Sequence, residues 1–132
     1  MSVGLLDTSV FIARESGRSL GALPDRVAVS VVTIGELQIG VLNAADDDVR
    51  ARRADTLALA RAADPIPISE AIMVSWARLV ADCRRAGVQR TVKLTDALIA
   101  ATAVEHGLSV VTQDADYEEI ADAHPPLRVI NV

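Results

Sequence analysis

Short apolar segments alternate along this chain with longer stretches in which apolar residues recur at helical spacing. The segments at 3–6, 27–29, 108–111 and 127–130 have the length and content of buried strands. Strands that alternate with helices predict a mainly parallel sheet covered on both faces. We therefore expect an α/β fold, a three-layer α/β/α sandwich, with residues 1–132 forming a single domain.

The predicted helices begin and end at residues that favour helix ends. A short helix follows from residue 10, and longer ones cover about 30–43, 46–63, 70–86 and 95–107. Ser30 and Thr95 are expected to cap two of them, and Gly87 suits the left-handed end of another. Residues 66–68 could form only a very short strand.

Composition limits the kind of protein this can be. Apolar residues make up 51% of the chain, which argues against disorder. Cys83 is the only cysteine, so an internal disulfide is excluded and a reduced, cytoplasmic compartment is expected. The N-terminus does not resemble a signal peptide, and no apolar run is long enough to span a membrane.

The net charge of −5 argues by itself against a nucleic-acid-binding protein. The basic residues are nearly all arginine, however, and arginine binds phosphate through two parallel hydrogen bonds. Several of them are grouped along the sequence. The candidate contacts to a phosphate backbone are Arg84, Arg85, Arg90 and Lys93, and a merely solvated helix end explains these residues equally well.

Carboxylates stand where strands end and helices begin. Asp7 follows the first strand, and Asp114 and Asp116 follow the strand at 108–111. Asp96 falls in the first turn of its helix, and Glu36 in the second turn of the helix that Ser30 opens. Because ligands bind at the carboxyl end of an open parallel sheet, these side chains can share one edge.

Several carboxylates in one place repel one another, and a divalent cation removes that repulsion. Ligands made only of oxygen select Mg²⁺ or Mn²⁺ over zinc. Neighbouring hydroxyl groups are expected to orient the carboxylates or bound water. They belong to Thr8, Ser9, Thr95 and Thr112.

Each acid also has a purely structural explanation, as a turn residue, a helix cap or part of a solvated face. The convergence of all of them at one edge is what favours a metal site. His106 and His124 are expected at helix ends or on the surface, and Cys83 in the core, so no side chain stands out as a nucleophile. Water is then the expected attacking group, with its pKa lowered by the metal ion.

Five segments, in this order, resemble those of PIN domains, and most closely the VapC-type toxins of toxin–antitoxin pairs. They are Leu5–Val10, Ser30–Val41 around Glu36, Lys93–Ala101 around Asp96, Val111–Tyr117, and Leu127–Asn131. The Val111–Tyr117 segment departs from the family pattern, since Asp114 occupies the place of a frequent amide. Both Asp114 and Asp116 are therefore kept as candidate ligands.

The resemblance implies a Mg²⁺- or Mn²⁺-dependent endoribonuclease in which all five acids, Asp7, Glu36, Asp96, Asp114 and Asp116, contribute to metal binding and catalysis. It further implies a homodimer and a cognate antitoxin protein.

The alternative is a catalytically inactive PIN-like module that binds protein or RNA. Receiver modules and dehalogenase-like phosphatases fit less well, because Ser9 stands where the latter need a second acid. Nucleotide-binding glycine motifs do not occur.

Overall fold

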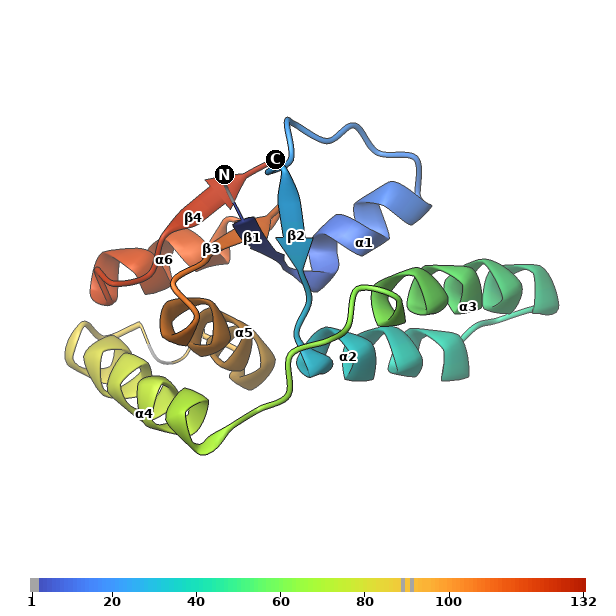
Figure 1. Ribbon diagram of the computed structural model, residues 1–132. Coiled ribbons are helices and arrows are strands. Elements are labelled where there is room, and N and C mark those ends of the chain that lie inside the picture. The colour runs from blue at the N-terminus through green and yellow to red at the C-terminus, as the bar shows by residue number, and fades with distance from the viewer. Residues whose placement is uncertain (1–2, 89, 91) are drawn as a thin grey trace.

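The computed structural model describes residues 3–88, 90 and 92–132. Within them lies a four-stranded sheet in the order β2-β1-β3-β4, and every neighbouring pair of strands is parallel (Figure 1). The strands are β1 Val3–Leu6, β2 Arg26–Ala28, β3 Ser109–Thr112 and β4 Val129–Asn131. The predicted parallel sheet is confirmed, with β1 and β3 at its centre.

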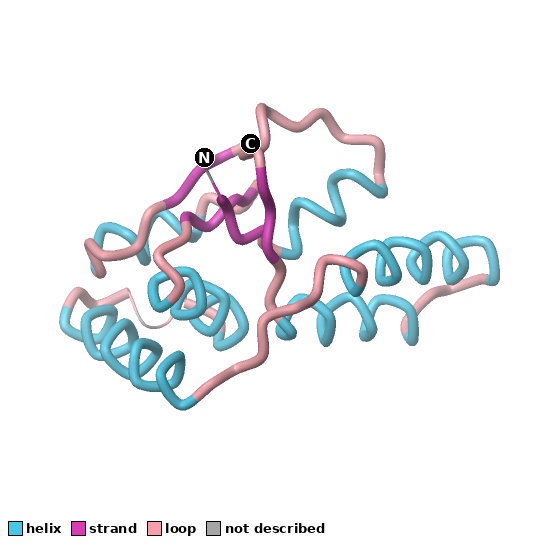
Figure 2. Tube along the Cα trace, in the orientation of Figure 1, coloured by secondary structure: helices cyan, strands magenta, loops and turns pink. Residues whose placement is uncertain are grey.

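Helices surround the strands, as Figure 2 shows. In the described part of the chain they are α1 Thr8–Glu15, α2 Val31–Leu42, α3 Asp47–Arg61, α4 Glu70–Arg85, α5 Leu94–Glu105 and α6 Asp116–Ala123. None of these helices is long and apolar enough to cross a bilayer. The sequence predicted the first five, whereas it indicated only a polar turn where α6 begins.

Side chains on alternating positions of the central strands separate two cores. Leu5 and Val110 pair across β1 and β3 and pack with residues of α4, α5 and α6. Their chain neighbours Leu6 and Val111 point to the other face and pack with residues of α1, α2 and α3. The period of two along a strand thus places helices on both faces, which confirms the three-layer sandwich.

Several helix ends follow their sequence signals. The Ser30 side chain accepts a hydrogen bond from the Val32 amide at 3.0 Å and caps α2. Gly87 has a φ of 77°, the left-handed conformation in which glycine is least strained.

The predicted cap at Thr95 is wrong. The cap residue of α5 is Lys93, whose carbonyl oxygen accepts from the Ala97 amide at 3.0 Å, so the helix begins at Leu94. The Lys93 side chain makes no capping hydrogen bond. Asp96 still falls in the first turn of α5, as the sequence predicted.

The close packing of β1 against β3 determines where the next residues lie. A Cβ atom at Gly4 would come within 2.5 Å of Val111 Cγ2, so only glycine fits there without displacement of its neighbours. Beyond the last paired residues, the Asp7 amide still donates to the Val111 carbonyl at 2.8 Å. The carboxyl ends of β1 and β3 therefore bring Asp7 beside the residues that follow Val111.

The remaining segment with strand character is minimal. Ile66 forms an isolated parallel bridge with Ser30, which is the very short pairing that the sequence allowed at 66–68. The Val31 amide donates to the Ile66 carbonyl at 3.1 Å, so the chain between α3 and α4 is anchored at the start of α2.

Candidate active site

Asp96 lies within electrostatic reach of three other carboxylates. The pKa of Asp96 is raised to about 6, mainly by burial and further by the negative charges of three acids, Asp7, Asp114 and Glu36. The positive charge of Lys93 lowers this pKa. These four acids come from the loop after β1, from α2, from the first turn of α5 and from the loop after β3. The tertiary structure therefore gathers four of the five predicted ligands at one edge of the sheet.

Asp7 is held on both of its carboxylate oxygens. It is 3% exposed and caps α1, with Oδ2 accepting from the Ser9 amide at 3.3 Å. The Thr112 hydroxyl also donates to Oδ2, at 3.0 Å, and the Tyr117 hydroxyl donates to Oδ1 at 2.9 Å. The position of this carboxylate is thus determined by three donors, which lie on α1, β3 and α6.

Glu36 is connected to Asp7 through the residue next to Asp7 in the chain. The Thr8 hydroxyl donates to Glu36 Oε1 at 2.7 Å and lies 3.0 Å from the Thr33 hydroxyl. Thr33 is completely buried on α2, and the sequence analysis did not single it out. Since Thr8 is the first residue of α1, this contact joins the starts of α1 and α2.

The loop after β3 distinguishes Asp114 from Asp116. The Asp114 amide donates to the Thr112 hydroxyl at 2.8 Å, and the Asp116 amide donates to Asp114 Oδ1 at 2.9 Å. Asp114 is partly buried and acts on the pKa of Asp96. Asp116 is exposed and is not among the charges that raise that pKa, so Asp114 has the closer electrostatic connection to Asp96.

Three of the four predicted hydroxyl groups contact the site. Thr8 binds Glu36 and Thr112 binds Asp7, as described above. The Ser9 hydroxyl lies 3.2 Å from that of Thr112 and accepts from the Gln113 amide at 3.0 Å. In the described part of the chain, the Thr95 hydroxyl makes no hydrogen bond to these carboxylates.

The site also contains an aromatic residue that was not among the candidates predicted from the sequence. Tyr117, in the first turn of α6, is completely buried, and its hydroxyl oxygen lies between Asp7 and Asp96. Burial is the main cause that raises the pKa of Tyr117, and the charges of Asp7 and Asp96 raise it further, so the hydroxyl remains protonated. The spacing of Tyr117 and Ile120 was the available sequence signal for α6.

The four basic residues that were predicted to contact a phosphate backbone differ in their relation to the acidic site. Arg84 and Arg85 are exposed at the end of α4, and Arg85 is paired with Asp82 at 2.6 Å. Arg90 is also exposed. Lys93 differs from them because its charge acts on Asp96, which places it beside the carboxylates.

Histidine and cysteine lie outside the acidic site. His124 follows α6 and is 2.7 Å from Asp82, whose pKa it lowers through that hydrogen bond. His106 follows the end of α5, and Cys83 is buried in the core. The expected structural roles of these residues are confirmed, and the acidic site offers oxygen ligands instead.

The donor set fits a hard divalent cation, although the carboxylates do not enclose one as they stand. Among residues 3–88, 90 and 92–132, no three acidic, histidine or cysteine side chains lie close enough together to hold a metal ion. The pKa of Asp96 is nevertheless raised by its burial and by the charges of three neighbouring acids, a repulsion of the kind that a bound divalent cation relieves.

The pKa of Asp96 predicts a pH dependence of stability for the metal-free protein. Since the folded-state pKa, about 6, is above the ordinary 3.8, the contribution of Asp96 is fully present below pH 3.8 and is lost as the pH rises through 6. The loss amounts to roughly 3 kcal/mol. In EDTA, the advantage of Asp96→Asn over the wild type should therefore grow by that amount between pH 4 and pH 7 in urea unfolding. If the free energies of unfolding of the two proteins changed in parallel with pH, the raised pKa assigned to Asp96 would be wrong.

Comparisons with known proteins agree with the fold. Residues 4–123 match the model of the PIN domain family. The chain is 75% identical over 103 residues to ribonuclease VapC8 of Mycobacterium tuberculosis, covering 78% of this chain and 92% of that protein. It is 43% identical to ribonuclease VapC5 of the same organism over 133 aligned positions, 99% of this chain and 96% of that one.

A solved structure extends this similarity to three dimensions. The crystal structure of VapBC-5, a member of the VapBC family of toxin–antitoxin systems from Mycobacterium tuberculosis, contains a chain with a TM-score of 0.89 and 39% identity. The match covers 100% of both chains. The family match, the sequence identity and the fold agree, and the protein belongs to the PIN domain family.

Proposed function

We propose that this protein is a metal-dependent endoribonuclease and the toxin of a toxin–antitoxin pair. The observation that carries the proposal is the gathering of Asp7, Glu36, Asp96 and Asp114 at the carboxyl edge of the sheet. The relatives named ribonuclease VapC8 and VapC5 support the same activity. In this proposal residues 1–132 act as one PIN-like domain.

Asp7 and Asp96 are the proposed direct ligands of Mg²⁺ or Mn²⁺, with Asp114 beside them. When bound, the cation lowers the pKa of a water molecule and neutralises charge that develops on the phosphate. Thr112 and the Ser9 amide keep the Asp7 carboxylate oriented, because both donate to its Oδ2 atom. Glu36 is the proposed ligand of a second ion or of a water molecule, and the hydrogen bond from Thr8 to Glu36 Oε1 supports a fixed orientation of its carboxylate.

Asp116 has a weaker claim to metal binding than Asp114. Its side chain is exposed, and its amide stabilises the loop through Asp114 Oδ1. We therefore assign Asp114 to the metal site and Asp116 to the support of the loop.

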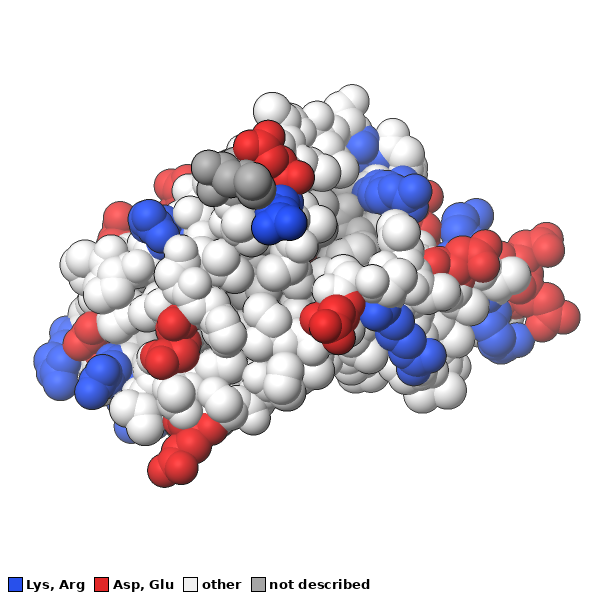
Figure 3. Space-filling model, in the orientation of Figure 1, with Lys and Arg blue, Asp and Glu red and all other residues white. Residues whose placement is uncertain are grey.

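The RNA is proposed to be held through its backbone. The basic side chains on the face in Figure 3 form separate groups among acidic ones, which suits local phosphate contacts. Lys93, whose charge acts on Asp96, is the first candidate for such a contact. The further candidates, all exposed on the surface, are Arg84, Arg85 and Arg90. Tyr117 is buried and Trp76 half-buried, so neither offers an open platform for stacking bases.

A cognate antitoxin is the proposed protein partner, since the similar crystal structure is of a toxin–antitoxin family member. A homodimer is also proposed, from the family resemblance. The single unpaired cysteine, Cys83, favours a reducing compartment such as the cytoplasm, where the RNA substrate is found.

The test of this function is the sequencing of RNA ends after induced expression in cells without an antitoxin. The expected result is a set of new 5′-phosphate ends that is absent from cells expressing Asp7→Asn. Identical end patterns for the two proteins, at equal protein levels, would instead favour the catalytically inactive PIN-like module.

A further inference from the structure

Tyr117 joins the two carboxylates that are proposed to bind the metal directly. Its hydroxyl donates to Asp7 Oδ1 at 2.9 Å, and the same oxygen lies 3.3 Å from Asp96 Oδ1. These carboxylates belong to segments 89 residues apart in the chain, before α1 and within α5. Tyr117 stands on a third segment, α6. A single hydroxyl group on α6 therefore contacts the residue that caps α1 and a residue in the first turn of α5.

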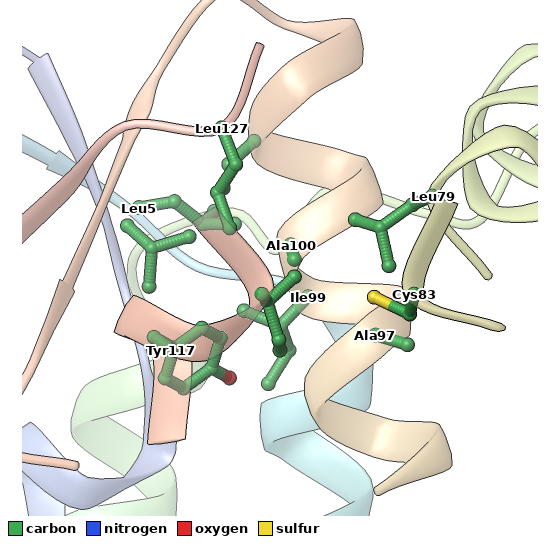
Figure 4. Packing of buried hydrophobic residues seen from close by; sticks show 11 residues of the cluster. Leu5, Leu79, Cys83, Ala97, Ile99, Ala100, Tyr117 and Leu127 are labelled. Atoms are coloured by element: carbon green, nitrogen blue, oxygen red, sulfur yellow. The ribbon is translucent and has the colours of Figure 1, made fainter. Parts of the chain in front are cut away.

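The position of this hydroxyl is determined by the core. Figure 4 shows the Tyr117 ring beside Leu5 and Ile99, with its hydroxyl oxygen pointing toward α5. The ring is completely buried in the same cluster as Leu5, Ile99 and Ile120. A side chain with two rotatable bonds and a fully packed ring has little freedom, so its oxygen is a fixed point for the flexible carboxylates.

The two carboxylates depend on Tyr117 to different degrees. Asp7 is also held by Thr112 and by the Ser9 amide. For Asp96, the Tyr117 hydroxyl is the only side-chain hydrogen-bond partner found among the residues that the structure describes. Without the hydroxyl, the Asp96 carboxylate would lose its orientation relative to Asp7.

We propose that Tyr117 is a positioning residue of the metal site, whose hydroxyl holds the carboxylates of Asp7 and Asp96 in the relative orientation from which they bind Mg²⁺ or Mn²⁺. This inference rests on the proposed metal dependence of the enzyme. In this role Tyr117 acts through the two carboxylates and contacts neither the RNA nor the attacking water molecule.

Two physical effects of removing the hydroxyl oppose each other. Loss of the donor frees Asp96 to rotate, which weakens metal binding, and partners of metal ligands typically contribute about 10-fold or more to affinity. Loss of the donor also leaves the negative charge of the carboxylates less compensated, which would strengthen the attraction for a cation. The positioning role requires that the first effect exceed the second.

The decisive variant is Tyr117→Phe, which keeps the ring and removes only the oxygen. Mn²⁺ affinity, measured by titration calorimetry, is expected to fall by about 10-fold in this variant. The matched control is Ile120→Val, a small change in the same buried cluster on the same helix, which should leave Mn²⁺ affinity unchanged. Unchanged or tighter binding in Tyr117→Phe, or an equal loss in Ile120→Val, would overturn the positioning role.

The chain has one tyrosine, so its hydroxyl can be observed directly. Protein labelled with ¹³C at the tyrosine Cζ atom should give a single NMR resonance that moves when Mg²⁺ is added. The movement is expected to be lost in Asp96→Asn. A resonance that does not respond to saturating Mg²⁺ would mean that the hydroxyl is not coupled to the metal site.

The same measurements separate this inference from the function on which it rests. Failure of the wild type to bind Mn²⁺ at all would refute the metal site, and the positioning role with it. Normal Mn²⁺ binding in the wild type, loss of binding in Asp96→Asn and full binding in Tyr117→Phe would refute the role of Tyr117 alone.

Discussion

Asp7→Asn should lower the rate of RNA cleavage by on the order of 10³-fold while the protein remains folded. The carboxylate supplies negative oxygen ligands to the cation, and an amide at this position removes the charge. Folding should be retained because Asn caps helices as well as Asp does, so the start of α1 keeps its capping bond to the Ser9 amide. Cleavage of a labelled RNA at equal protein concentrations, together with circular dichroism, measures both effects.

The chain offers a matched control for this substitution. Asp46 caps α3 through the Val49 amide at 2.9 Å and is exposed, with no bond to the acidic site. Asp46→Asn should therefore leave both the fold and the cleavage rate unchanged. If Asp7→Asn cleaved RNA as fast as Asp46→Asn, the proposed ligand role of Asp7 would be wrong.

Removal of divalent cations should have an effect of similar size. EDTA is expected to reduce cleavage to the background of the Asp7→Asn variant, and Mn²⁺ or Mg²⁺ in excess should restore it. The reason is that the described site offers oxygen ligands, with His124 engaged by Asp82 and Cys83 buried in the core. The measurement is the cleavage rate before chelation, in EDTA and after re-addition of each ion.

Two controls make the chelation result specific. EDTA already saturated with Mg²⁺ should leave the rate unchanged, which excludes a direct effect of the chelator on the protein or RNA. Restoration by Mn²⁺ should fail in Asp7→Asn. Cleavage that continues in EDTA at the original rate would contradict a metal-dependent mechanism.

The ionised Asp96 carboxylate is unfavourable to the metal-free fold. Asp96 is nearly buried beside other acids, and its raised pKa means that ionising it weakens the folded state. The surrounding hydroxyl groups of Thr8, Thr112 and Tyr117 compensate only part of this repulsion. A bound cation would supply the rest, so metal binding and stability should be coupled.

Local signals were sufficient for most of the fold. Ser30, Asp46 and Gly87 mark helix ends through bonds and backbone angles that depend on neighbouring residues only. Short apolar runs likewise predicted the four strands, and apolar residues at helical spacing predicted the helices between them, because a parallel strand that is covered on both faces is apolar throughout. The cap of α5 was misplaced by two residues, since Thr95 has the chemistry of a cap but the backbone of Lys93 makes the turn.

The sequence by itself determined the order of the elements and the identity of the acids, since both depend on residue type and spacing along one segment. Only the tertiary structure decided which acids meet. Packing of β1 against β3 brings Asp7 to Thr112, the loop after β3 leaves Asp114 partly buried and Asp116 exposed, and the core places the Tyr117 hydroxyl between two carboxylates. Contacts between residues about 20 to 110 positions apart leave no local pattern, because they arise from packing of whole elements.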